Sequence, residues 1–136
     1  MERLTKRCKR QSKLAASVTQ GVGASEEARA PVVALEKLLR TNSGFTRDQL
    51  ALVEMAETSA AQALAVRDAF DLDEHQLNPD GGALVRGYPL GAASAVSVVR
   101  LFTRMIRAPQ DARLRYGAVT QGAIGGLGVA ALFEAV

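Results

Sequence analysis

The chain has 136 residues, long enough to bury one hydrophobic core, and 48% apolar with 23% charged residues is the balance of a soluble globular domain rather than a disordered chain. No apolar run approaches the roughly 18 residues of a membrane span, and nothing resembles a secretory signal. The single cysteine, Cys8, excludes an internal disulfide, and we expect a cytoplasmic protein.

The net charge of +3 is concentrated at the N-terminus. Residues 1–13 hold six Lys/Arg and one Glu, a net charge of +5, whereas the remainder has a net charge of −2. We therefore expect a basic arm at residues 1–12 and a domain at residues 13–136. The arm is either a solvated tail or a segment that binds phosphate or anionic lipid. It has no aromatic residues to stack on bases, so nucleic acid is not an expected partner.

The first half of the domain alternates predicted strands and helices. Residues 13–23 have a β-branched centre and end in glycines, which predicts a strand that runs into a loop. Residues 25–41 start with a Ser/Glu cap signal and carry apolar residues at helical spacing. A short buried strand is predicted at residues 50–54, followed by an Ala-rich helix at residues 58–70 that begins at a Thr/Ser pair.

The second half predicts a loop, a long helix and two strands. Residues 71–82 have loop composition, and His75 lies there without a nearby Cys or His, as expected of a surface histidine. Residues 89–109 predict an apolar helix with one narrow polar stripe, which indicates burial on most sides. The stripe consists of Ser97, Arg100, Arg104 and Arg107. The pattern of residues 113–136 predicts two strands joined by a glycine-rich turn. This order predicts an α/β domain with helices covering a mostly parallel sheet.

Three segments, in this order, resemble the C-terminal half of thiolases. Residues 53–65, VEMAETSAAQALA, resemble the family's Val-Glu-Ile-Asn-Glu-Ala-Phe-Ala-Ala-Gln segment. Residues 77–95, LNPDGGALVRGYPLGAASA, resemble Asn-x-Asn-Gly-Gly-Ala-x-x-x-Gly-His-Pro-Leu-Gly-Ala-Ser-Gly, and residues 122–134, GAIGGLGVAALFE, resemble Cys-x-Gly-Gly-Gly-x-Gly-x-Ala-x-x-Phe-Glu. With a weaker match at residues 18–39, the resemblance covers residues 13–136. It implies a thiolase C-terminal domain with a mixed, mostly parallel sheet of five strands and helices on both faces.

The resemblance breaks at the reactive side chains. Thiolases make or break a carbon–carbon bond beside a coenzyme A thioester, through an acylated cysteine of their N-terminal half. Their C-terminal half supplies an Asn, a His and a Cys, and the matching positions here are Ala56, Tyr88 and Gly122. Tyrosine titrates near pH 10 and cannot replace histidine as a base at neutral pH, although it can donate a hydrogen bond to an oxyanion. We therefore expect this site to have lost ordinary thiolase activity.

What the resemblance preserves is an acidic residue and the backbone. Glu57 remains from the Asn-Glu pair, and Gly87, Pro89 and Gly91 retain the loop around Tyr88. Three glycines of the last segment match a turn whose amides help to form an oxyanion hole in the family: Gly125, Gly126 and Gly128. Folding alone can also require glycine at such positions. No metal site and no bound cofactor are expected, and a coenzyme A thioester is the candidate ligand.

In the thiolase fold, the helix that matches residues 90–107 lies in a layer shared by the two halves. We expect it to expose an apolar side here, which requires an obligate partner. That partner is either a chain like the thiolase N-terminal half or a second copy. Three functions are open: a non-catalytic subunit, an acyltransferase that uses Tyr88 as oxyanion donor and Glu57 as base, or a small binding protein that acts through its basic arm.

Overall fold

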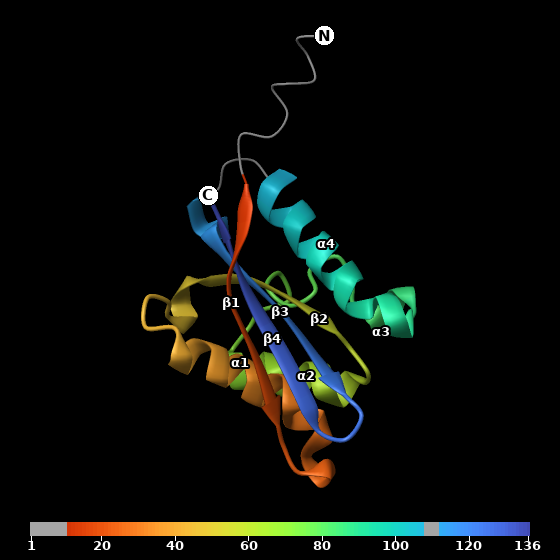
Figure 1. Cartoon of the computed structure of the whole chain (residues 1–136). Coiled ribbons are helices and arrows are strands. Elements are labelled where there is room, and N and C mark those ends of the chain that lie inside the picture. Colours follow the sequence, from red (N-terminus) through yellow and green to blue (C-terminus); the bar gives the residue numbers. More distant parts are fainter. Residues whose placement is uncertain (1–10, 108–111) are drawn as a thin grey trace.

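The helices of the described chain pack on a single four-stranded sheet. The computed structural model describes residues 11–107 and 112–136, so most of the basic arm predicted at residues 1–12, with Cys8, lies outside the described residues. The strands of the described part follow the order β1-β4-β3-β2 across the sheet (Figure 1). They are β1 (Ser12–Gly21), β2 (Leu50–Ala56), β3 (Tyr116–Ala123) and β4 (Leu127–Ala135).

The α/β class and the mixed sheet are confirmed, but the expectation of a mostly parallel sheet is wrong. Among the described strands, only β2 and β3 are hydrogen-bonded in parallel, whereas β4 is antiparallel to both of its neighbours, β3 and β1. The cause is the turn after β3. Because Gly125 and Gly126 adopt positive φ angles there, the chain reverses within a few residues and β4 inserts between β3 and β1.

The expected fifth strand is also absent from the described residues. Its place beside β2 is taken by the loop around Leu77, which makes a single parallel bridge to Val53. Around this bridge, the Val53 amide donates to Gln76 and the Val53 carbonyl accepts from Asn78. The backbone turns away immediately afterwards, since Asn78 has a positive φ of 45°. The edge of β2 is therefore covered without a further strand.

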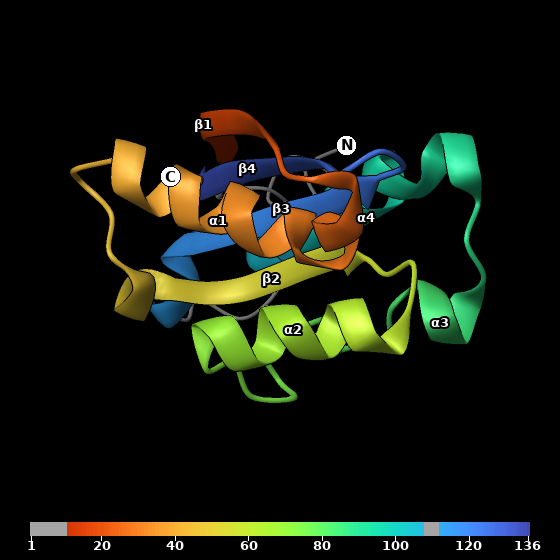
Figure 2. The same ribbon diagram turned by 90° about the horizontal axis from the view of Figure 1, so that it is seen from below.

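Two helices, α1 (Ala30–Thr41) and α2 (Ala60–Phe70), cover one face of the sheet (Figure 2). α1 follows the 3-10 helix η1 (Ala24–Arg29), so the predicted helix start near Ser25 is wrong, and Pro31 lies in the first turn of α1. The predicted start of α2 is confirmed, because the Ser59 side chain accepts from the Gln62 amide. The main core lies between these helices and the sheet, and Leu35, Leu38, Val53, Ala130 and Leu132 are among its buried members.

The opposite face carries α4 (Ala93–Arg107), which follows α3 (Ala83–Arg86) and the 3-10 helix η3 (Leu90–Ala92). The remaining 3-10 helices are η2 (Arg47–Gln49) and η4 (Ala112–Arg115). α4 packs on β2 and β3, and its Leu101 and Met105 join a second apolar cluster. The close approach depends on Gly117, where a Cβ atom would lie 2.7 Å from Leu101.

The expectation that this helix is buried on most sides is wrong, because only the side facing the sheet is covered by the described chain. Val99 is 62% exposed and Phe102 is 47% exposed. The polar stripe lies toward β2 instead of solvent at Ser97, which is 3% exposed. On the same face of the sheet, beside α4, Leu127 and Val129 of β4 are also exposed. Apolar side chains are thus exposed both on the outer side of α4 and on the same face of β4.

Candidate functional site

The candidate site lies where the parallel strands β2 and β3 end. Ala56 is the last residue of β2 and is paired in register with Gln121 of β3, which precedes Gly122. The loop before α4 reaches this edge, where the Gln121 side-chain amide lies 3.2 Å from the Tyr88 hydroxyl. The structure therefore brings the three substituted positions to the carboxyl ends of these strands, the usual location of ligand sites in open α/β folds.

Tyr88 is held by a short side-chain network. Its half-buried hydroxyl accepts a hydrogen bond from the Nε2 amide of Gln121. The Gln121 carbonyl oxygen accepts in turn from the hydroxyl of Ser94, in the first turn of α4. No local sequence pattern singles out Gln121 or Ser94, because the two residues are joined only by a contact between β3 and α4.

A side chain at position 122 would point away from this network, toward α1 and α2. A Cβ atom at position 122 would lie 2.8 Å from Gln62 Nε2 and 3.3 Å from Pro31. Gln62 is buried, and its carbonyl oxygen accepts from the backbone amide and the hydroxyl of Thr58. Since the space beside Gly122 is filled, a larger side chain there would have to displace Gln62.

Glu57 anchors the backbone of the loop. Its Oε1 accepts from Asn78 Nδ2 at 2.6 Å, and its Oε2 accepts from the Leu84 amide at 3.0 Å. A side chain at Gly82 would overlap this carboxylate, so the glycine lets the loop close over it. Both oxygens of Glu57 are engaged, which suits a structural carboxylate better than the general base considered from the sequence.

Asn78 is a structural residue that the sequence indicated only as part of a loop. Its Oδ1 accepts from the Met55 amide at 2.7 Å, and its Nδ2 donates to the Met55 carbonyl at 3.1 Å. Asn78 thus pairs with β2 as a strand residue would, while its third contact reaches Glu57. Its positive φ, which asparagine tolerates well, is the physical reason for this residue type.

The glycine-rich turn after β3 is shaped largely by packing. Side chains at Gly126 and Gly128 would meet the Val22 and Ala30 carbonyl groups, so β4 needs glycine to approach the chain before α1 and α1 itself. The Gly125 amide donates to Glu27 Oε2 at 3.3 Å. One amide that the resemblance assigns to an oxyanion hole therefore binds a carboxylate of the same chain.

The glycines of the Tyr88 loop divide into two kinds. Gly87 has a φ of +93°, which favours glycine. Gly91 has neither a positive φ nor a neighbour that a Cβ atom would touch. Pro89 and Gly87 line a small cavity together with Ala56, at the end of β2.

Comparison with known proteins identifies the family. Residues 8–135 match the family described as "Thiolase, C-terminal domain". The chain belongs to this family. It is 35% identical to the beta-ketoadipyl-CoA thiolase of Acinetobacter baylyi over 130 residues, covering 94% of this chain and 31% of that protein. The curated relatives extend well beyond the match, since the chain spans only about 30% of their length.

Solved structures agree with this family. A Bacillus anthracis acetyl-CoA acetyltransferase superposes with a TM-score of 0.82 and 29% identity, covering 92% of this chain and 30% of that one. The Acat5 thiolase from Ascaris suum in complex with coenzyme A gives a TM-score of 0.81 and 30% identity, covering 92% and 31%. The predicted thiolase C-terminal fold is confirmed.

This thiolase C-terminal domain also contains a buried ion pair beside the candidate site. Glu54 of β2 is 2% exposed, and its Oε2 accepts from Arg100 Nε of α4 at 3.1 Å. Arg100 also donates to the Gly81 carbonyl, which ties the loop to the helix. Burial raises the pKa of the Glu54 carboxyl, although the Arg100 guanidinium opposes this shift. The pair joins sheet, helix and loop.

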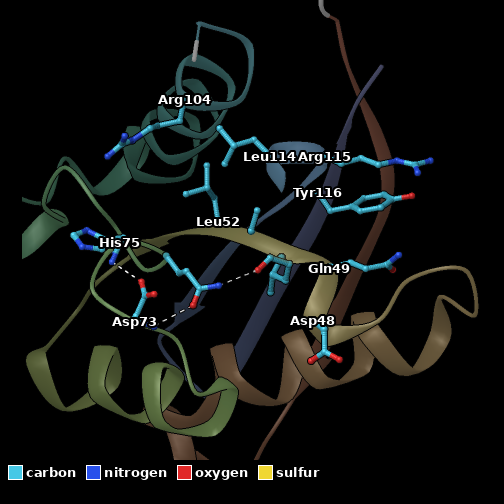
Figure 3. Close-up of a pocket in the computed structure, with 12 residues that line it drawn as sticks. Asp48, Gln49, Leu52, Asp73, His75, Arg104, Leu114, Arg115 and Tyr116 are labelled. Atoms are coloured by element: carbon cyan, nitrogen blue, oxygen red, sulfur yellow. Dashed lines mark hydrogen bonds between the residues drawn. The ribbon is translucent and has the colours of Figure 1, made fainter. Parts of the chain in front are cut away.

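A wider cleft of about 590 Å³ lies at the other end of the domain, where β2 and β3 begin (Figure 3). Leu50, Tyr116 and Arg104 contribute to its lining. His75 is exposed there, as expected, and its backbone amide donates to the Asp73 carboxylate. The cleft is remote from Tyr88, because it lies at the opposite ends of the same strands.

Within residues 11–107 and 112–136, no three His, Cys, Asp or Glu side chains are grouped as metal ligands. In the same part of the chain, no helix has the length and apolar character needed to cross a membrane.

Proposed function

We propose that this domain is a non-catalytic subunit that completes the fold of a thiolase-like partner and forms one wall of its acyl-CoA pocket. The observation that carries the proposal is the uncovered apolar surface beside α4. It comprises Leu90, Val99, Phe102, Leu127 and Val129, each at least 40% exposed. Contiguous apolar surface of this kind marks an interface on most proteins.

The position of this surface favours a partner that supplies a helix. α4 packs mainly on β2 and β3 and leaves the same face of β4 exposed at Leu127 and Val129. The uncovered strip therefore lies beside α4 and over β4. In the resemblance to thiolases, each half contributes helices to a shared layer, so a chain like the thiolase N-terminal half is the occupant we favour. A second copy of this domain is the alternative.

The non-catalytic part of the proposal rests on the substituted positions. Ala56 and Gly122 carry no group that transfers a proton, and the space beside Gly122 is filled by Gln62 and Pro31. Glu57 is engaged through both oxygens. General acid–base groups contribute roughly 10²- to 10⁴-fold each to a reaction rate. The loss of the family's His, at Tyr88, and of its Cys, at Gly122, therefore leaves little ordinary thiolase activity.

The test is the state of association with and without the apolar surface. The chain, purified from its native host, should elute as a complex in size-exclusion chromatography with light scattering. Val99→Glu with Phe102→Glu should abolish the complex while the far-UV circular dichroism stays unchanged. The control is Leu64→Glu, which introduces a glutamate at an exposed leucine of α2. A monodisperse wild-type monomer at micromolar concentration would contradict the proposal.

A second candidate function is acyl transfer by the assembled complex, with Tyr88 as the oxyanion donor. The observation in its favour is the network that fixes the Tyr88 hydroxyl at the carboxyl end of β3. Acyl-CoA turnover by the complex that falls sharply in Tyr88→Phe would support this function. Equal turnover by both proteins would remove Tyr88 from the reaction.

A further inference from the structure

Two departures from the thiolase-like segment meet on one side chain. Residues 77–95 carry Tyr88 where that segment has His and Ser94 where it has Gly. In the structure, the Tyr88 and Ser94 hydroxyls both contact the Gln121 side-chain amide, one at each end. Two substitutions six residues apart thus complete one network with a residue of β3.

We propose that Gln121 and Ser94 are positioning residues that fix Tyr88 as a hydrogen-bond donor to the carbonyl oxygen of an acyl thioester. The identity of the ligand as a thioester rests on the proposed acyl-CoA pocket. The direction of the network does not, because it follows from the contacts of this chain alone. Tyr88 is the residue that touches the ligand, and the other two act through it.

The direction of the network is set by the donors. The Ser94 hydroxyl donates to the Gln121 carbonyl, which turns the Gln121 amide nitrogen toward Tyr88. The Tyr88 oxygen accepts from that nitrogen and keeps its own proton free. A hydroxyl that accepts one hydrogen bond becomes a better donor of the next. The free proton is therefore available to an acceptor such as a carbonyl oxygen.

The ligand test compares acetyl-CoA with coenzyme A, which lacks the carbonyl group. Calorimetry on the chain in its native assembly should show tighter binding of acetyl-CoA. Tyr88→Phe should lower this preference about two- to tenfold, the range expected for one hydrogen bond. Gln121→Glu should lower it equally, because a carboxylate accepts the Tyr88 proton itself.

The matched control is Gln49→Glu, which adds the same charge at the other end of the sheet, where the side chain needs only an acceptor for the Thr46 amide. It should keep the wild-type preference. Equal binding of acetyl-CoA and coenzyme A by the wild type, or a preference that survives Gln121→Glu, would overturn the proposal.

A second measurement separates the network from the partner. In the chain alone, labelled with ¹³C at the tyrosine ring Cζ, Gln121→Glu and Ser94→Ala should shift the Tyr88 resonance and leave Tyr116 unchanged. Tyr116 is the internal control because its hydroxyl contacts Glu134. Unchanged Tyr88 signals in both variants would overturn the positioning role. Shifted signals in a chain that binds no partner would keep that role and reject the proposed subunit function.

Discussion

Gly128 and Gly91 both belong to the thiolase-like segments, yet the described fold needs only one of them. A Cβ atom at position 128 would overlap the Ala30 carbonyl group, whereas one at position 91 would touch nothing. We expect Gly128→Ala to lower the free energy of unfolding by about 3 kcal/mol, since β4 and α1 must separate. Gly91→Ala should change it by no more than about 0.5 kcal/mol. Urea unfolding measures both, and equal effects would contradict this assignment.

Glu57 provides a second prediction at the residue scale. Glu57→Gln replaces one acceptor oxygen by an NH₂ group that faces a donor, either Asn78 Nδ2 or the Leu84 amide. The expected loss in the free energy of unfolding is about 1.5–3 kcal/mol, the usual value for a hydrogen bond to a charged group. A variant as stable as the wild type would show that the carboxylate is not an anchor and would reopen its role as a base.

Between elements, the pair of Glu54 and Arg100 links β2 to α4. Arg100→Met leaves the Glu54 carboxylate buried without its partner, which should cost about 3 kcal/mol at neutral pH. The folded-state pKa of Glu54 is raised by burial, so protonation relieves the penalty as the pH falls through that pKa. The destabilisation should therefore shrink in acid. Arg104→Met, which breaks an exposed pair with Asp80, is the control and should cost no more than about 1 kcal/mol.

Glu134 links other elements and has the opposite pH dependence. Hydrogen bonds from Lys13 of β1 and from Arg115 lower its pKa to about 2. A lowered pKa means that the fold favours the carboxylate, so its stabilisation is present above pH 4.5 and is lost as the pH falls toward 2. The urea midpoint of the wild type should fall over this interval more steeply than that of Glu134→Gln. Parallel curves would show that this cluster does not contribute.

The sequence predicts elements better than their contacts. Local patterns place most helices and strands of the described part, because cap residues such as Ser59 and the glycines after β3 act over a few residues. Strand order depends on where β4 inserts, which no local pattern encodes. The loop around Tyr88 could be predicted from its resemblance to a thiolase motif. Gln121 could not, because its role comes from a contact with Tyr88, which lies 33 residues away in the sequence.

For the whole molecule, the exposed surface beside α4 predicts that stability depends on concentration. If a second copy covers Val99 and Phe102, dissociation accompanies unfolding and the melting temperature of the pure chain must rise with protein concentration. If the partner is a thiolase N-terminal-half-like chain, the melting temperature should stay constant for the pure chain and rise when that chain is added. Differential scanning calorimetry over a hundredfold range of concentration distinguishes the two. A constant melting temperature that no thiolase N-terminal-half chain raises would mean that this surface has neither partner.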